Sequence, residues 1–250
     1  MGTDGHVTLD RNDGVALITV SSTEVRNALT PEMGMQLVEL CDTIDADASI
    51  GAAVIRGGDG TFCSGADTRR WGKNDDPVSE EGYESTLAIY AAFVRVGQLK
   101  VATVAAVRGS AVGAGMNLFM ATDLRVVATN ARLLGGFLRI GLHPGGGFFS
   151  LAGRLAGRQT AAAIGLFGEE ISGQRAVELG LAWEAVKDEE VEDRAMELAR
   201  YAAIDPLLAR RALESYRFEL DPSPVSWPAA VAMERGVQMW SQRRRQRLQT

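Results

Sequence analysis

The sequence predicts an α/β fold built from strand-strand-helix units and followed by a helical region. Short, nearly continuous apolar runs bounded by glycine, such as residues 52–56 and 101–107, fall in the first two-thirds of the chain. Such runs are typical of strands covered on both faces. From about residue 147 onward, apolar residues recur with helical spacing instead. Strands are therefore expected before this point and helices after it.

The first elements are predicted to be a hairpin and a helix. Residues 6–9 and 15–21 are rich in β-branched side chains and flank the turn signal Asn12-Asp13-Gly14. Thr30-Pro31-Glu32 then supplies an N-cap, a first-turn proline and an early acid, which predicts a helix to about Asp45.

The middle of the chain repeats strands and helices. We expect strands at 52–56, 101–107 and 124–128, a helix at about 80–96, and a further helix that ends near Met120. After residue 147 the expected helices span residues 148–155, 159–167, 173–179, 189–203, 207–218 and 225–241. Apolar stripes on helices with little core left to cover favour packing against another copy of the chain.

Composition excludes several classes of protein. The 250 residues are 46% hydrophobic and 23% charged, which is typical of a globular chain that needs no disulfide or metal for stability. The net charge of −6 argues against nucleic-acid binding, and the arginines at 243, 244, 245 and 247 fit a solvated helix end better than a phosphate site. No apolar run is long enough to span a membrane. Two cysteines without a CxxC pattern favour the cytoplasm, and two distant histidines imply no metal.

Two glycine-bearing loops follow predicted strands, at residues 61–67 and 109–118. Small residues let backbone approach a ligand, and a helix that opens at Gly113 would aim free N–H groups at an anion. The loops match neither GxGxxG, nor GxxxxGK[ST], nor GxSxG, so a nicotinamide dehydrogenase, a P-loop NTPase and an α/β-hydrolase lose support.

Together these loops resemble the crotonase family, also called the enoyl-CoA hydratase/isomerase family, in which FCxGAD and GxxxGGGxxLAxxCDxRxA segments form two halves of an oxyanion hole. The resemblance covers nearly the whole chain. Its further matches are Val25-Arg26-Asn27-Ala28-Leu29, the segment 122–128, Gly141-Leu142-His143-Pro144 with Gly147, and Gly180-Leu181-Ala182 with Val186.

The resemblance implies a crotonase-like spiral of ββα units at residues 1–190, with an acyl-CoA pocket, and a C-terminal helical oligomerisation region at residues 191–250. A homotrimer or a hexamer is expected. Many relatives carry an additional helix that ends near a KRxPxF motif, which has no match here, so the covering of the pocket stays open.

The resemblance also implies site residues. The amides of Ala66 and Ala114 would hold the thioester oxygen, although the family usually has glycine at the position of Ala114, where a positive φ would strain alanine. The two catalytic glutamates of the hydratases fall on Asn117 and Phe137. Neither side chain can act as a general acid or base, so efficient hydration is not expected.

Other groups remain as candidates for proton transfer. An imidazole is the side chain suited to proton transfer at neutral pH, so His143 is the tentative acid or base, while a role in supporting its loop is favoured. An acid from segment 71–84 is an alternative. Asp67 and Asp123 are interpreted as structural, and Cys63 as a small core residue.

The remaining predicted contacts to substrate are spread over both loops. They comprise Arg26, Ala28, Ser64, Asp67, Thr68, Arg69, Gly113, Asn117 and Phe137, with Phe137 as a wall beside the acyl chain. The guanidinium groups of Arg26, Arg69 and Arg70 suit CoA phosphates. No cofactor is implied beyond the coenzyme A of the substrate.

Two function classes follow. The chain is either a family enzyme, such as an isomerase, a thioester hydrolase or a decarboxylase, that polarises a thioester carbonyl, or an acyl-CoA-binding or regulatory protein that has lost the chemistry. A fatty or aromatic acyl group fits both classes.

Overall fold

The computed structural model describes residues 5–70, 79–220 and 226–248. Its strands form two sheets, and the larger has six strands in the order β1-β2-β3-β4-β6-β9. Their bounds are β1 (His6–Asn12), β2 (Val15–Ser21), β3 (Ala52–Gly57), β4 (Ala102–Val107), β6 (Leu124–Ala128) and β9 (Glu184–Val186). The smaller sheet contains β5 (Ser110–Val112), β7 (Arg132–Leu134) and β8 (Glu170–Ser172) in that order.

The predicted hairpin is confirmed. Strands β1 and β2 pair antiparallel with His6 opposite Ser21 and Asn12 opposite Val15. The turn residues Asp13 and Gly14 both adopt positive φ, at 49° and 77°, as a two-residue hairpin turn requires. From β2 onward all neighbours in the large sheet run parallel.

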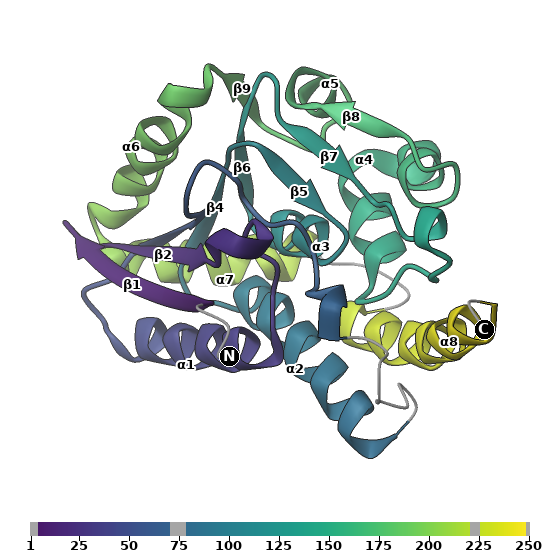
Figure 1. Cartoon of the computed structure of the whole chain (residues 1–250). Coiled ribbons are helices and arrows are strands. Elements are labelled where there is room, and N and C mark those ends of the chain that lie inside the picture. The colour runs from purple at the N-terminus through teal and green to yellow at the C-terminus, as the bar shows by residue number, and fades with distance from the viewer. Residues whose placement is uncertain (1–4, 71–78, 221–225, 249–250) are drawn as a thin grey trace.

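Helices separate and cover these strands (Figure 1). Their bounds are α1 (Pro31–Ala46), α2 (Glu80–Gly97), α3 (Ala114–Ala121), α4 (Phe148–Gly165), α5 (Gly173–Glu178), α6 (Val191–Ala203), α7 (Pro206–Leu220) and α8 (Trp227–Leu248). The order β1-β2-α1, β4-β5-α3 and β6-β7-α4 confirms the expected strand-strand-helix repeat. Thr30 caps α1 as predicted, because its side chain accepts a hydrogen bond from the Met33 amide.

The expectation that strands end in the first two-thirds was wrong. Strands β8 and β9 lie in the last third, and β5 and β7 were also missed in the middle of the chain. Each of the four has three residues, which is too short for an apolar period to appear. Their pairing comes from neighbours distant in sequence, as when β9 extends β6 with Val127 opposite Ala185.

Apart from the end of the last helix, the helix ends were predicted to within a few residues. The expected break between residues 155 and 159 is a kink inside α4 at Gly157, whose φ of 78° and ψ of 171° are not helical. The last helix continues to Leu248, beyond the expected end at residue 241.

Helix α6 packs along the large sheet against β2, β3, β4 and β6, and its residues Val191, Ala195 and Ala199 are buried there. On another side of the sheet, α1 packs against β1 and α2. The domain boundary near residue 190 stays a prediction, and the helix immediately beyond it is part of the layer that covers the core (Figure 1).

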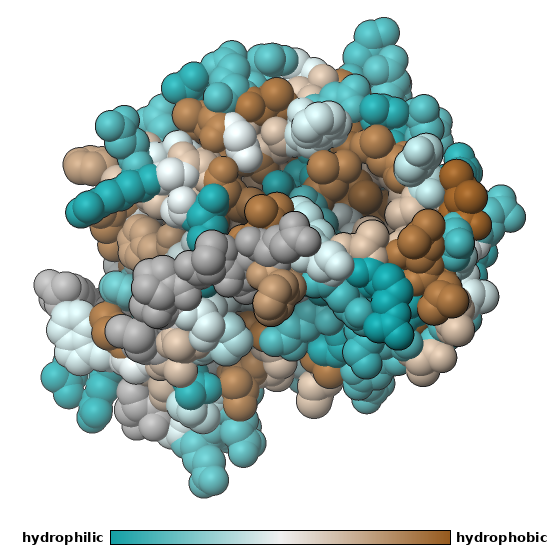
Figure 2. All heavy atoms as spheres, turned by 180° about the vertical axis from the view of Figure 1, so that it is seen from behind, coloured by the Kyte–Doolittle hydropathy of each residue, from teal (hydrophilic) through white to brown (hydrophobic). Residues whose placement is uncertain are grey.

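Apolar side chains are exposed on α7 and at the end of α6. Tyr201, Ile204, Leu207 and Leu208 are mostly exposed, and Ile204 retains 77% of its accessible surface. They lie beside a hollow of 620 Å³ that also reaches the start of β4 and of β6. Figure 2 shows hydrophobic residues gathered around a hollow on this face. Among the described residues, no helix has the length and apolarity needed to cross a membrane.

Candidate functional site

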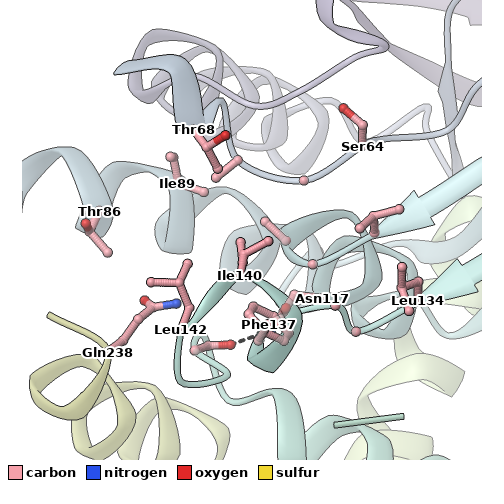
Figure 3. Close-up of a pocket in the computed structure, with 18 of the residues that line it drawn as sticks. Ser64, Thr68, Thr86, Ile89, Asn117, Leu134, Phe137, Ile140, Leu142 and Gln238 are labelled. Carbon is pink, nitrogen blue, oxygen red and sulfur yellow. Dashed lines mark hydrogen bonds between the residues drawn. The ribbon is translucent and has the colours of Figure 1, made fainter. Parts of the chain in front are cut away.

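A cavity of 220 Å³ lies where the two glycine-bearing loops meet α2 and α8 (Figure 3). The lining residues come from five parts of the chain. They are Ser64, Gly65, Ala66, Thr68, Thr86, Ile89, Tyr90, Phe93, Val112, Gly113, Ala114, Asn117, Leu134, Gly135, Gly136, Phe137, Arg139, Ile140, Leu142, Gly145 and Gln238. The lining is therefore mostly apolar, with a few polar groups, as is common in ligand sites.

Residues 25–29, one of the segments that resemble the family, hold the first loop in place by hydrogen bonds. The Asn27 side chain accepts a hydrogen bond from the Ser22 amide and donates to the carbonyl oxygens of Gly58 and Thr61, at 2.7 and 2.5 Å. The Leu29 amide donates to the Gly65 oxygen at 2.7 Å. These bonds fix the loop on both sides of Ser64.

The two loops are joined by a short parallel ladder. The Cys63 amide donates to the Ser110 oxygen, and the Val112 amide donates back to the Cys63 oxygen, each at 3.0 Å. At Gly115 a Cβ would lie 2.2 Å from the Cys63 oxygen, so only glycine permits this approach. The start of α3 is thus fixed against the first loop.

The structure answers the question of strain at Ala114. The positive φ of this loop, 53°, belongs to Gly113, which is the N-cap residue of α3. Ala114 is the first residue of the helix and is absent from the non-glycine residues with positive φ. Alanine therefore fits here without the cost that a left-handed conformation would impose.

Two backbone amides in the cavity wall have no partner within the part of the chain that the structure describes. Among the described residues, neither the Ala66 nor the Ala114 N–H donates a hydrogen bond. Ala66 lies opposite Leu29 in a parallel bridge, but the two hydrogen bonds of that bridge are formed by its neighbours: the Leu29 amide donates to the Gly65 oxygen, and the Asp67 amide donates to the Leu29 oxygen. A Cβ on Gly65 would lie 3.8 Å from the Ala114 nitrogen, which shows how closely the two loops approach. Two such donors are suited to an oxygen that gains negative charge.

Asn117 occupies the cavity wall in a fixed orientation. Its Nδ2 donates to the carbonyl oxygens of Gly145 and Gly146, at 3.1 and 3.0 Å, and only 1% of the residue is exposed. The amide thus presents its oxygen as an acceptor and has no group that could take up a proton at neutral pH. Phe137 lines the cavity and meets Phe148 edge-on, with ring centroids 5.1 Å apart.

The described lining contains no carboxylate and no imidazole. His143 is outside it, with Nδ1 2.6 Å from the Pro144 oxygen and its ring 6.4 Å from that of Phe149. Its role as an acid or base stays a prediction. Of the alternative segment 71–84, residues 71–78 lie outside the described residues, and Glu80, Glu81 and Glu84 are exposed on α2.

The structure separates the predicted contact residues into two groups. Ser64, Thr68, Gly113, Asn117 and Phe137 line the cavity with Ala66 and Ala114, whereas Arg26, Ala28, Asp67 and Arg69 do not. Their contact with substrate therefore stays a prediction, and the side chain of Arg70 lies outside the described residues.

Asp67, Cys63 and Asp123 have structural surroundings. The Asp67 carboxylate forms a two-pronged ion pair with Arg69, with both distances 2.9 Å. Burial raises the pKa of the Cys63 thiol to about 12, so it carries no thiolate near neutral pH. Asp123 accepts hydrogen bonds from the amide and hydroxyl of Thr103 and ties α3 to the start of β4.

The last helix covers the cavity. Trp227 donates from Nε1 to the Gly146 oxygen at 2.9 Å and stacks on Phe93, while Gln238 contributes its side chain to the lining. Between them, Glu234 accepts a hydrogen bond from the Gly147 amide at the start of α4, at 2.7 Å. Figure 3 shows Gln238 reaching in from α8. Helix α8 thus contributes to the wall of the cavity, and whether it closes the pocket stays open.

Glu234 is a titratable group beside this site whose surroundings perturb it. Burial raises the pKa of its carboxyl to about 7, although the amides of residues 147–149 pull the pKa in the opposite direction. The charged form is therefore disfavoured in the docked helix.

Sequence reasoning missed the contributions of α2 and α8. Thr86, Ile89, Tyr90 and Phe93 are spaced as one helical face and line the cavity. The spacing was a usable signal for a buried face, but it does not distinguish a cavity wall from ordinary core. Gln238 had no signal, because its role depends on how α8 docks. Among the described residues, no group of His, Cys, Asp and Glu could hold a metal ion.

Comparisons with known proteins agree with this geometry. The family model "Enoyl-CoA hydratase/isomerase" matches residues 10–238. A probable enoyl-CoA hydratase of Mycobacterium tuberculosis is 38% identical over 200 residues, which cover 80% of this chain and 76% of the relative. The 1,2-epoxyphenylacetyl-CoA isomerase of Escherichia coli is 33% identical over 199 residues, with 77% and 74% covered.

Among solved structures, that of Pseudomonas aeruginosa OdaA superposes with a TM-score of 0.83 at 28% sequence identity. The alignment covers 95% of this chain and 93% of that one.

Proposed function

Because the chain belongs to the enoyl-CoA hydratase/isomerase family, we propose that it binds an acyl-CoA thioester and polarises the thioester carbonyl with the amides of Ala66 and Ala114. The single observation that carries this proposal is the pair of unpartnered N–H groups in the cavity wall. Both amides belong to backbone that is fixed by other hydrogen bonds, so they need no rearrangement to receive an oxygen.

The two donors would stabilise the thioester most when its oxygen becomes an oxyanion. Enolate or tetrahedral species place negative charge on this atom, and one preorganised donor typically contributes ~3 to 4 kcal/mol to such a state. The positive end of α3 adds to the effect because Ala114 is its first residue. The apolar wall around Phe137 excludes water and strengthens these interactions.

Hydration of an enoyl thioester is proposed to be slow. Addition of water needs a general acid and a general base near the two reacting carbons, and each well-placed group contributes ~10²- to 10⁴-fold. Asn117 uses its amide hydrogens to hold the glycine loop, and Phe137 cannot transfer a proton. With crotonyl-CoA as substrate, turnover well below ~10 per second is expected from the loss of enoyl absorbance.

A variant at Ala114 tests the amide pair directly. Proline is tolerated at the first position of a helix and replaces the N–H with a ring carbon, so the donor is lost and its place is filled. Ala114→Pro should therefore lower the affinity for a medium-chain acyl-CoA about 10-fold in calorimetric titration. Ala114→Ser retains the N–H and should bind as the wild type does. Equal binding by both variants would refute the amide pair, and no binding by the wild type would refute the proposed function.

The second candidate function is that of an acyl-CoA-binding or regulatory protein without turnover. The described lining favours it, because no carboxylate or imidazole reaches the cavity. Native mass spectrometry would identify the CoA species retained by the protein. Incubation with that species then separates the two candidates, since only an enzyme would convert it.

The apolar face on α6 and α7 supports the proposal that the chain assembles as a homotrimer or a hexamer. An exposed surface of this kind is typical of an interface between protein chains. Two free cysteines, both buried, fit a cytoplasmic protein.

A further inference from the structure

The side chain of Asn117 in α3 has one end that the fold uses and one end that it does not. Nδ2 donates to the carbonyl oxygens of Gly145 and Gly146, at 3.1 and 3.0 Å. A reversed amide would set Oδ1 against these two oxygens, so the hydrogen bonds fix which end is the acceptor. Oδ1 itself has no hydrogen-bond partner among the described residues.

Oδ1 is open to the cavity. Asn117 is one of the lining residues, although only 1% of it is exposed. Within the described residues, the sealed side-chain atoms that lack a partner are Tyr90 Oη, Gln238 Oε1 and Gln242 Oε1, and Asn117 Oδ1 is not one of them. An unpartnered oxygen that keeps accessible surface can be reached by a ligand atom, whereas those three atoms cannot.

Support of the glycine loop explains Nδ2 and leaves Oδ1 unexplained. A hydrocarbon chain that lies against Oδ1 displaces water from it without replacing the hydrogen bond, which weakens binding. A ligand group that donates a hydrogen bond restores it. A carbonyl, ether or carboxylate oxygen does not, because both atoms would then be acceptors. Oδ1 therefore favours a ligand atom that carries a hydrogen.

The place of Asn117 in α3 defines which part of the ligand meets it. Asn117 follows Ala114 by three residues, and residues at this spacing are neighbours on one helix face, with ~5 to 6 Å between their Cβ atoms. The Ala114 amide is the proposed donor to the thioester oxygen, so the acyl carbons next to the thioester lie closest to Asn117. Figure 3 shows Asn117 beside Phe137, whose ring offers no charge. A neutral hydroxyl group suits these surroundings better than an ammonium group.

We propose that Asn117 Oδ1 accepts a hydrogen bond from a hydroxyl group on the second or third carbon of the acyl chain, and so selects hydroxyacyl thioesters over unsubstituted ones. This inference rests on the proposed binding of acyl-CoA and makes Asn117 a specificity-determining residue. The amide recognises the hydroxyl as a neutral acceptor and takes up no proton from it.

The test compares matched CoA thioesters by calorimetric titration of the wild type. Butyryl-CoA is compared with compounds that carry a hydroxyl or a methoxy group on the second or the third carbon, in each configuration. At the position that faces Asn117, the hydroxyl compound should bind about 5-fold more tightly than butyryl-CoA. The methoxy compound has the same oxygen without the hydrogen and should bind no better than butyryl-CoA. Enoyl absorbance checks that the hydroxyl compounds stay intact during the titration.

Three variants assign the preference to Asn117. Asn117→Leu has a similar shape but no acceptor, and it should abolish the preference for the hydroxyl compound. Asn117→Asp keeps an acceptor oxygen in either protonation state and should retain the preference. The matched control is Thr86→Val, which removes a lining hydroxyl that already donates to the Gly82 oxygen at 3.0 Å, and it should also retain the preference.

The outcomes separate this inference from the proposed function. Equal affinities of the wild type for hydroxyl and unsubstituted thioesters at both positions would overturn the inference and leave the proposed function intact. A methoxy compound that binds as tightly as the hydroxyl compound would have the same effect, and so would a preference that persists in Asn117→Leu. Lack of binding of all thioesters would overturn both. The comparisons of ligands need only the wild type, so they decide the matter even where a variant folds poorly.

Discussion

His143 directs Nδ1 to the oxygen of Pro144, at 2.6 Å, and its carbonyl oxygen faces the Gln238 amide on α8, at 3.4 Å. The first contact is made by the side chain and supports the loop behind the cavity, whereas the second is made by the backbone and is kept in an alanine variant. His143→Ala should therefore weaken thermal stability or ligand affinity without a selective loss of rate toward a turned-over thioester. Steady-state kinetics across pH checks this. A drop of ~10²-fold in kcat with affinity and fold preserved would instead make the histidine an acid or base.

Glu234 is expected to make stability depend on pH. Its pKa is about 7 in the folded chain and that of an ordinary glutamate in the unfolded chain. Below the ordinary value both states are protonated, and the stabilising contribution is fully present. As pH rises through about 7 the unfolded chain has already ionised, so the contribution is lost.

Glu234→Gln should remove this dependence while retaining an acceptor for the Gly147 amide. Between pH 5 and pH 8, the stability of the wild type should fall relative to the variant by on the order of 1 to 2 kcal/mol, since partial exposure screens the effect. Urea unfolding at several pH values measures it. Parallel pH profiles of the two proteins would contradict the assignment.

At the scale of single residues, the sequence singled out residues in continuous motifs that prove to line one cavity, while their roles stay predictions. Ala66, Ala114, Ser64 and Asn117 belong to the two loops, and the structure brings all four to one cavity. Tyr90 and Gln238 could not be predicted as cavity residues, because their position depends on how α2 and α8 dock. Docking is set by packing between distant segments, which leaves no local pattern in the sequence.

Helix α4 shows how a single element depends on its glycines. Gly157 adopts φ 78° and ψ 171°, a conformation essentially restricted to glycine, whereas Gly153 is helical, and a Cβ at either position would meet open space. Gly157→Ala should therefore destabilise the protein by ~1 to 3 kcal/mol. Gly153→Ala, its matched control, should stabilise it by ~0.5 to 1 kcal/mol.

Chemical denaturation of both α4 variants is the measurement. Because neither added methyl group contacts another residue, the difference between them reports backbone conformation alone. Equal effects of the two substitutions would show that residue 157 can become helical, so that the kink is not fixed by the fold.

At the scale of elements, length decided what the sequence could predict. The strands of five or more residues and all the long helices had clear periods or boundary signals, as with Thr30-Pro31 at the start of α1. The three-residue strands had none, since their few hydrogen bonds are formed with partners such as β6 that the chain brings alongside later. These short strands form only because the fold brings their pairing partners alongside them.

The whole molecule should associate through the apolar face of α6 and α7. Leu208 is 65% exposed on this face and lines its hollow. Leu208→Glu should reduce the mass measured by light scattering from that of a trimer or a hexamer to that of a monomer, because a charge would be buried at the interface. Met35→Glu, at a residue 53% exposed on α1, is the control and should leave the mass unchanged. A monomeric wild type would refute the assembly.

The hydrogen bond from Gly147 to Glu234 joins residues 87 positions apart in the chain. A ribosome that adds ~5 to 20 residues per second completes α8 roughly 5 to 20 s after the glycine loop that this helix covers. During that interval the nascent chain already has both glycine-bearing loops but lacks Trp227 and Gln238, so the apolar cavity is open on one side. Chaperones that act during translation would find their binding surface here, between the synthesis of α4 and that of α8.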